Sequence, residues 1–244
     1  MKVFVGFDDT DVIDSSYGTG KLVRWFQAQL PDDCHCQGVV RQQLLVCEAI
    51  PFTSHNSAAC MVVDVPDPGL ADVVIDLAVR HIHRHAADGS DPGLCVAVEG
   101  SSAISALIDF GSECTHRVRS QADAMRFAAG AHLSGHGGTF DGIIGAAAAV
   151  GLTASGWSGR YIELGDLRSS PEIMAVSEIR EKRIEVVSED RDAQLPAPQD
   201  RVLTNQWLRP RLLGHRPVLL VRRKCDGVWE NVYGKRRKAV HQTA

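Results

Sequence analysis

The chain opens with an apolar run, Lys2 to Phe7 (KVFVGF), that is followed at once by Asp8-Asp9-Thr10-Asp11. The run predicts a buried β-strand. Three carboxylates within four residues repel one another unless a cation offsets their charge. Mg²⁺ is the expected cation, because it prefers hard oxygen ligands and shares them with substrate phosphates. Asp8, Asp9 and Asp11 are therefore the candidate metal ligands and catalytic residues. A solvated turn that caps a helix is the alternative.

Strand patterns alternate with helix patterns along most of the chain. The apolar spacing predicts further strands over residues 39–46, 58–65, 94–98 and 161–164. It predicts helices over residues 20–30, 70–85, 101–110, 121–133 and 143–150. We therefore predict an α/β fold, a mixed sheet with flanking helices, with a small C-terminal β-rich module. The C-terminal edge of such a sheet is where ligands bind.

Composition divides the chain into three parts. Residues 169–200 are charged and contain prolines (LPAPQD), which is typical of a linker. After them, β-like runs over residues 216–223 and 228–233 flank an Asp-Gly pair, the signal of a hairpin turn. We expect a main domain over residues 1–168, a charged linker over 169–200 and a small basic β module over 201–244.

Charge is distributed unevenly between these parts. Residues 201–244 hold 11 Lys/Arg against 2 Asp/Glu, whereas the first 200 residues hold 15 against 28. An acidic body suits a divalent metal, and a basic segment suits phosphate or RNA. No run of about 18 apolar residues is present, and the N-terminus lacks the pattern of a signal peptide. We expect a cytoplasmic protein without a membrane partner; its oligomeric state stays open.

A loop of small residues, SSYGTGK at 15–21, precedes the helix predicted from residue 20. Free backbone N–H groups and the dipole at a helix N-terminus favour a phosphate. Thr10, Gly18 and Gly20 are therefore candidates for nucleotide binding, although a plain helix cap explains the loop equally well. The loop is not a Walker A motif, which requires Ser or Thr where Leu22 follows Lys21.

A second candidate is the glycine-rich segment SGHGGTFDG at 134–142, which runs into the small-residue helix pattern IIGAAAAV. Repeated glycine before a helix lets the backbone approach a ligand closely. The candidate binding glycines are Gly135, Gly137, Gly138, Gly142 and Gly145. Close helix packing is the alternative.

His55 and Asn56 lie in a polar stretch (SHNS) before the strand predicted over 58–65, where they could face the same cleft, although an ordinary loop explains them as well. Cys114 and Arg117 lie near Glu113 and His116, but their spacing does not hold a nucleophile and a base together, and we assign them no catalytic role. The tetrapeptide DPGL occurs at 67–70 and 91–94 and is interpreted as turn chemistry.

The chain contains, in this order, the first strand with DDTD, then Thr19, the SHNSAA segment and the glycine loop that runs into DGIIGAAAAVG. This order of motifs resembles the tRNA agmatinylcytidine synthetases, which modify a cytidine in an isoleucine tRNA. The resemblance is to that family's N-terminal kinase-like domain and covers roughly residues 1–165. It places the family's ATP–Mg²⁺ carboxylates on Asp8, Asp9 and Asp11. It places a phosphorylatable threonine on Thr19.

The resemblance implies an ATP- and Mg²⁺-dependent synthetase or kinase-like enzyme that activates a substrate oxygen by phosphoryl transfer. The acceptor would be a small molecule or nucleoside, with an amine as a candidate partner, and RNA would bind through the basic segment. One alternative is a haloacid-dehalogenase-like phosphatase with Asp9 as nucleophile and Asp11 as acid/base. Another is a non-catalytic module that binds nucleotide or RNA.

Overall fold

The computed structural model describes residues 1–50, 55–190 and 194–232. They belong to two compact units, Met1–Leu164 and Gly165–Ala244. The first unit ends four residues before the limit expected from composition. Among the described residues, no helix is long and apolar enough to cross a membrane.

The first unit is built on a six-stranded sheet in the order β5-β4-β1-β3-β2-β6. The strands are β1 (Lys2–Asp8), β2 (His35–Gln43), β3 (Ser57–Asp64), β4 (Gly93–Val98), β5 (His132–Gly135) and β6 (Arg160–Glu163). Every neighbouring pair in this sheet is antiparallel. The predicted α/β class is confirmed, and the sheet of this unit is antiparallel throughout.

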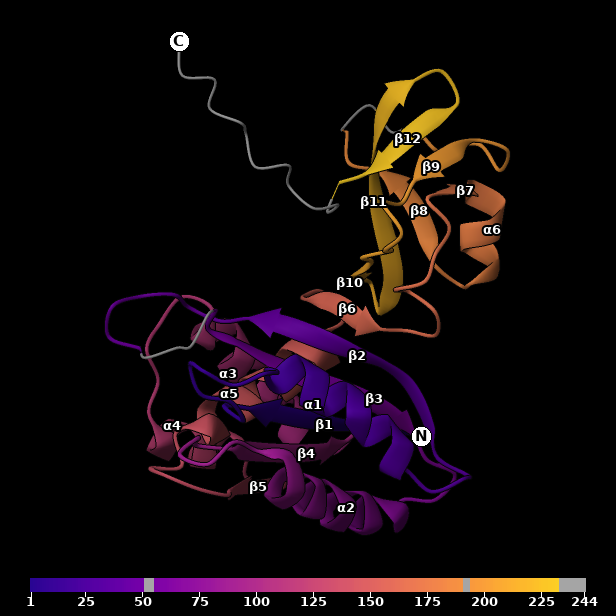
Figure 1. Ribbon diagram of the computed structural model, residues 1–244. Coiled ribbons are helices and arrows are strands. Elements are labelled where there is room, and N and C mark those ends of the chain that lie inside the picture. Colours follow the sequence, from indigo (N-terminus) through magenta and orange to yellow (C-terminus); the bar gives the residue numbers. More distant parts are fainter. Residues whose placement is uncertain (51–54, 191–193, 233–244) are drawn as a thin grey trace. The chain divides into compact units, whose positions relative to one another are not determined.

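Helices cover both faces of this sheet (Figure 1). On one face lie α1 (Thr19–Phe26), continued by a 3₁₀ turn (Gln27–Gln29), and α2 (Leu70–His85). On the other lie α3 (Ala103–Cys114), α4 (Gln121–Phe127) and α5 (Gly142–Ser155). The alternating side chains of β1 serve both cores: Val3, Val5 and Phe7 pack with α1 and α2, and Phe4 packs with α3 and α5.

The helix expected over residues 121–133 is shorter in the structure. It ends at Phe127, and Gly130 has a φ of +90°, a conformation that stops a helix. The chain then forms β5, which pairs with β4. The sequence did not predict this strand, because four residues are too few to show an alternation of apolar and polar side chains.

The antiparallel pairing brings three separate segments to one end of the sheet. Asp8, the last residue of β1, lies opposite Gly93, the first residue of β4. Phe7 lies opposite Ala59, near the start of β3. The residues just after β1 therefore meet those just before β3 and β4. Gly142 at the start of α5 joins them, since a Cβ on Gly93 would lie 2.0 Å from its carbonyl carbon.

The second unit contains β7 (Ile173–Ala175), α6 (Val176–Glu181), β8 (Glu185–Ser188), β9 (Arg201–Leu203), β10 (Arg211–Leu213), β11 (Arg216–Cys225) and β12 (Val228–Asn231). Its strands follow the order β10-β11-β12-β9-β7, and β8 pairs with β11. The pairs β8–β11 and β9–β12 are parallel and the other pairs are antiparallel, so this is a mixed sheet. The expected hairpin between β11 and β12 is present.

The segment expected to be a linker, residues 169–200, instead contains β7, α6 and β8. Charged residues dominate its composition, but Met174, Val176, Ile179 and Val186 are buried at intervals among them. Short elements of three to six residues do not give a periodic pattern that composition can reveal. The basic module expected over 201–244 is thus one part of a larger unit, and residues 233–244 of it lie outside the described residues.

Candidate functional site

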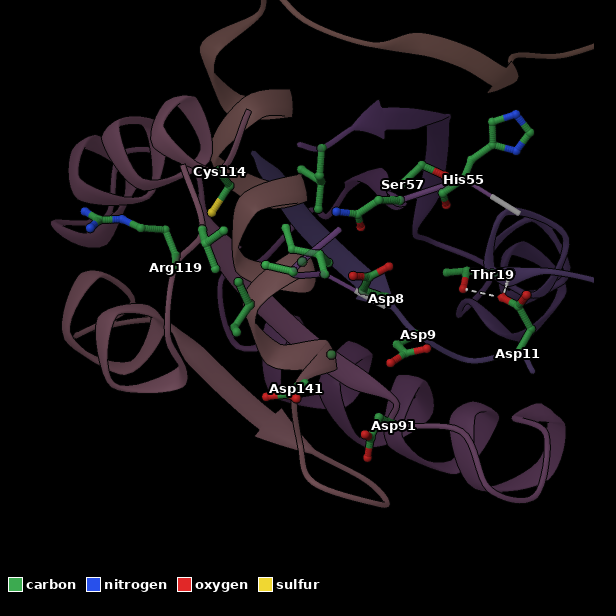
Figure 2. Close-up of a pocket in the computed structure, with 18 of the residues that line it drawn as sticks. Asp8, Asp9, Asp11, Thr19, His55, Ser57, Asp91, Cys114, Arg119 and Asp141 are labelled. Carbon is green, nitrogen blue, oxygen red and sulfur yellow. Dashed lines mark hydrogen bonds between the residues drawn. The ribbon is translucent and has the colours of Figure 1, made fainter. Parts of the chain in front are cut away.

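A cavity of about 310 Å³ lies where these strand ends meet the start of α5 (Figure 2). Its size falls in the usual range of small-molecule sites. The lining combines several carboxylates with apolar and basic side chains. The lining comprises Asp8, Asp9, Asp11, Thr19, Leu44, Ala49, Ile50, His55, Asn56, Ser57, Asp91, Cys114, Arg117, Val118, Arg119, Asp141, Gly142, Ile144 and Gly145.

Asp8 lies directly against the first turn of α5. A Cβ built on Gly145 would fall 1.7 Å from Oδ2 of Asp8, so only glycine leaves room for the carboxylate. Burial, and then the charge of Asp9, raise the pKa of Asp8 to about 8, although a hydrogen bond from the backbone of Asp9 acts in the opposite direction. The site therefore holds a carboxylate that is costly to ionise without a cation.

Asp9 follows with a φ of +52°, in the left-handed region that few residues other than glycine adopt. Successive side chains of a strand point to opposite faces, yet Asp8 and Asp9 both line the cavity. The left-handed conformation ends the strand alternation and makes this possible. Burial together with the charges of Asp91, Asp11 and Asp141 raises the pKa of Asp9 to about 6.

Asp11 is held in a hydrogen-bonded network with the first residue of α1. Its Oδ1 accepts hydrogen bonds from the backbone N–H of Thr19 at 2.9 Å and from the Thr19 hydroxyl at 3.0 Å (Figure 2). The backbone N–H and hydroxyl of Thr10 donate to Thr19 Oγ1 at 3.2 and 3.0 Å. Thr10 is 1% exposed and does not line the cavity, so it supports Thr19 rather than contacting a ligand.

The histidine and asparagine before β3 also line the cavity, at positions His55 and Asn56. The Asn56 side-chain amide donates to the backbone carbonyl of Leu45 at 2.6 Å, and the backbone carbonyl of Asn56 accepts from the N–H of Leu44. This pair of bonds fixes the segment that leads into β3. The structure thus brings both residues to the place where the sequence pattern expected them.

The glycines expected to bind a cofactor separate into two groups. Gly142 and Gly145 line the cavity, whereas Gly135, Gly137 and Gly138 do not. Cβ atoms on those three would meet Phe140, the carbonyl of Ser90 and the carboxylate of Asp91, respectively. For them, close packing of the turn before α5 is the better interpretation. Gly18 and Gly20 also lie outside the lining, and Gly18 is the N-cap of α1.

Sequence reasoning missed Asp91 and Asp141, which complete a ring of carboxylates with the three near β1 (Figure 2). Asp91 opens the second DPGL tetrapeptide and accepts hydrogen bonds from the hydroxyl of Thr139 at 2.8 Å and the N–H of Phe140 at 3.3 Å. Asp141 is the N-cap of α5. Their positions before a predicted strand and a predicted helix were the available signal.

The cavity is also lined by Cys114 and Arg117, which were expected to have no catalytic role, and by Arg119. Arg119 pairs with Glu113 and lies 3.9 Å from Asp123, and its guanidinium points away from the carboxylates (Figure 2). Arg117 forms no ion pair with any carboxylate among the residues that the structure describes. It is therefore the arginine of the cavity whose charge stays available for a ligand.

The carboxylates suit a Mg²⁺ ion that two of them hold together with phosphate oxygens. Within residues 1–50, 55–190 and 194–232, no three His, Cys, Asp or Glu side chains are placed to hold a metal ion together. Oδ1 of Asp11 is already occupied by Thr19. Asp8 and Asp9, with their raised pKa values, are the pair whose charge a cation would offset. Mg²⁺ is commonly held by one or two carboxylates plus phosphate oxygens, and this donor set suits that arrangement.

No family model and no curated protein matches the chain. Solved structures do. The crystal structure of a tRNA fluorescent labeling enzyme shares 26% sequence identity at a TM-score of 0.52, covering 62% of this chain and 36% of that one. A complex of TiaS with its isoleucine tRNA and ATP gives the same identity, TM-score and coverage. The chain resembles TiaS. TiaS is an agmatidine synthetase that acts on an isoleucine tRNA, and the resemblance expected from the motifs is confirmed.

A further TiaS complex, with the same tRNA, AMPCPP and agmatine, covers 75% of this chain and 44% of that one, with 24% identity and a TM-score of 0.50. That likeness concerns the fold alone. The chain spans between 36% and 44% of the length of these solved proteins. The TiaS fold is thus shared, over a part of TiaS.

Proposed function

We propose that this protein is an ATP- and Mg²⁺-dependent tRNA-modifying enzyme that activates a substrate oxygen by phosphoryl transfer. The observation that carries the proposal is the pair Asp8 and Asp9, whose pKa values are raised inside a cavity closed by the glycine-lined start of α5. Perturbed carboxylates in a cavity are typical of functional sites. The resemblance to TiaS, which was crystallised with tRNA and ATP, supports the same conclusion.

Asp8 and Asp9 would hold the metal with phosphate oxygens. Mg²⁺, when bound, would neutralise charge on the phosphates. Gly142 and Gly145 line the cavity at the start of α5, and the missing side chain of Gly145 lets the Asp8 carboxylate lie beside the phosphate chain. Arg117 would supply positive charge to the phosphates. Apolar side chains also line the cavity, and they suit a nucleobase: Leu44, Val118 and Ile144.

Thr19 is the candidate phosphoryl acceptor of the site. Its hydroxyl donates to Asp11, which places a carboxylate in position to take the proton as the oxygen attacks the γ-phosphorus of ATP and ADP leaves. Both hydrogen bonds that Thr19 Oγ1 accepts come from Thr10, so attack requires one of them to open. In the other role, Thr19 would contact phosphate without forming a bond.

The phosphatase alternative is supported less well. It requires Asp9 as the nucleophile and Asp11 as the acid/base, but Asp11 Oδ1 is engaged by two groups of Thr19. It also gives no reason for Gly145, whose missing side chain makes room for Asp8. The present arrangement favours a role for Asp11 in orienting Thr19.

Turnover of ATP by the variant Asp9→Asn tests the proposal. Asparagine tolerates the left-handed backbone at this position, so the fold should be retained. We expect the rate of ATP turnover with Mg²⁺ and a transfer RNA pool to fall by about 100-fold, because a metal ligand is lost at the charge-bearing centre. Radiolabelled ATP, with AMP and ADP separated, measures both rate and product.

The control is Asp109→Asn, which neutralises an exposed carboxylate on α3 and should leave the rate unchanged. The proposal is wrong if the wild-type protein neither binds nor turns over ATP with Mg²⁺. It is equally wrong if Asp9→Asn and wild type have the same rate.

A second test separates the two roles of Thr19. Thr19→Ser keeps the hydroxyl, whereas Thr19→Ala removes it. If Thr19 accepts phosphate, the alanine variant should lose covalent ³²P labelling and at least about 10-fold in turnover, and the serine variant should keep both. Labelling is measured by autoradiography after incubation with ATP, and mass spectrometry locates the modified residue. Unchanged turnover in Thr19→Ala would contradict a catalytic role.

A further inference from the structure

The second unit carries a cation–aromatic cluster that the proposed catalytic site does not use. The guanidinium carbons of Arg168 and Arg209 lie 4.3 and 3.7 Å from the centre of the Trp207 ring. Arg168 is exposed, and Trp207 and Arg209 are half-buried. These three residues are called the Trp207 cluster below.

The cluster rests on a fixed base. Leu167 and Leu208, the neighbours of Arg168 and Arg209, are buried at 1% and 0% exposure, and the N–H of Leu208 donates to the carbonyl of Leu167 at 3.0 Å. The carbonyl of Trp207 accepts from the side chain of Asn231 at 3.1 Å. The backbone is thus held in place beneath all three side chains, which reduces the entropy lost when a ligand binds.

The turn just before the cluster has an unusual backbone. Asn205 and Gln206, both exposed, have φ values of +54° and +61°. Two consecutive non-glycine residues in the left-handed region are costly, and such strain is concentrated at functional positions. Thr204 holds the turn, since its hydroxyl donates to the carbonyl of Pro171 at 2.5 Å and accepts from the N–H of Gln206 at 3.0 Å. Two amide side chains are thereby presented beside the Trp207 cluster.

We infer that the Trp207 cluster, together with the Asn205–Gln206 turn, is a docking surface for a single-stranded segment of RNA. The Trp207 ring orders the two guanidinium groups, which contact phosphates and can stack on bases through the faces turned away from the ring, and amides bond to base edges. A bare phosphate would need only the arginines, and an acidic protein would need no amides held in a strained turn. The inference rests on the proposed function for its RNA partner.

RNA binding measured by fluorescence anisotropy over a series of salt concentrations tests the inference. The probes are a transfer RNA pool and a fluorescein-labelled RNA of about 20 nucleotides, a length that exceeds a single-strand site. The double variant Arg168→Glu/Arg209→Glu should bind both RNAs at least about 10-fold more weakly. The salt dependence of its binding should also be shallower by about two ion contacts. Trp207→Ala should lose about 10-fold in affinity because the arginines lose the ring that orders them, and Trp207→Phe should keep most of the affinity because it retains a ring for them to stack on.

The matched control is Lys182→Glu, a charge reversal at an exposed position after α6 in the same unit. It should change RNA affinity by less than about 3-fold, because an isolated exposed charge contributes little. Circular dichroism confirms that each variant is folded. The inference is overturned if the double variant and Lys182→Glu bind RNA equally. It is also overturned if a polyglutamate peptide binds the wild-type protein more tightly than RNA does and competes with RNA for it.

The failure of this inference can be told apart from failure of the proposed function. RNA binding is measured without ATP, and ATP binding with Mg²⁺ is measured on the same variants by calorimetry. Loss of RNA affinity with ATP affinity retained supports the docking surface. If wild type and the double variant bind RNA with the same affinity while both bind ATP, the docking surface alone is overturned.

Discussion

Replacing Asp8 by asparagine is expected to stabilise the ligand-free protein and at the same time to abolish ATP turnover. Asp8 lies beside Gly145 and has its pKa raised to about 8 by burial and by the charge of Asp9. An amide of the same shape removes the charge. The variant also loses a ligand of the proposed Mg²⁺ site, so the proposed ATP turnover should fall by about 100-fold or more.

The sign of the stability effect follows from proton binding. The carboxyl of Asp8 has an ordinary pKa of 3.8 when exposed and about 8 in the folded protein, so the folded state holds more protons between these values. Stability from this group is complete below about pH 4 and is lost as the pH rises toward 8. Asp8→Asn has no carboxylate to ionise, so its free energy of unfolding does not fall in this way. The difference in stability between Asp8→Asn and wild type should therefore grow from about pH 5 to about pH 8.5.

Thermal unfolding at these two pH values, in EDTA and without nucleotide, measures the effect. At the higher pH we expect a gain of at least about 1 kcal/mol, which corresponds to about 2–4 °C for a chain of this size. Asp109→Asn is the control, because it lies on the exposed face of α3. A variant that is less stable than wild type at the higher pH would show that Asp8 is stabilised by a partner other than a metal.

Gly145→Ala should inactivate the enzyme although it adds only a methyl group. The new Cβ would lie 1.7 Å from Oδ2 of Asp8, which is a severe steric overlap. A shift of the helix alone cannot relieve it. Asp8 must turn away from the cavity, and a displacement of about 1 Å at a catalytic group can reduce turnover by about 100-fold. Turnover of radiolabelled ATP with Mg²⁺ measures the loss, and calorimetry measures the weaker binding of ATP.

Gly18→Ala is the matched control for this variant. A Cβ on Gly18 would lie 3.5 Å from the carboxylate of Asp11, an ordinary contact, and its φ of −103° suits alanine. We expect a loss of at most about 1 kcal/mol in stability from the altered helix cap, with turnover near that of wild type. If Gly145→Ala turns over ATP as fast as Gly18→Ala, the placement of Asp8 against α5 is wrong.

The sequence was most informative where apolar residues form long runs. β1, α1 and α2 lie within a few residues of their expected limits, because each has a continuous buried pattern. The carboxylates after β1 could also be found, since three acids in four residues are conspicuous in any chain. Asn56 reached the cavity as expected, because it directly precedes a buried strand.

The remaining site residues depend on contacts that no local pattern contains. Asp91 enters the cavity because β4 pairs antiparallel with β1, a register that the residues of neither strand specify alone. Gly135 and Gly138 could not be told from ligand-binding glycines, since packing against Phe140 and Asp91 places the same demand on the backbone. The linker interpretation of 169–200 failed because its elements are too short to show a period.

The antiparallel pairing of β1 with β4 also ties the carboxylates to the folding of the whole first unit. Asp8 and Gly93 are far apart along the chain, so they meet only after non-local strand pairs have formed. An unfolded chain therefore presents no binding site to Mg²⁺ and ATP, which would bind the native state alone and shift the folding equilibrium toward it. In a cell, the lifetime of such a protein would rise and fall with the supply of its own nucleotide.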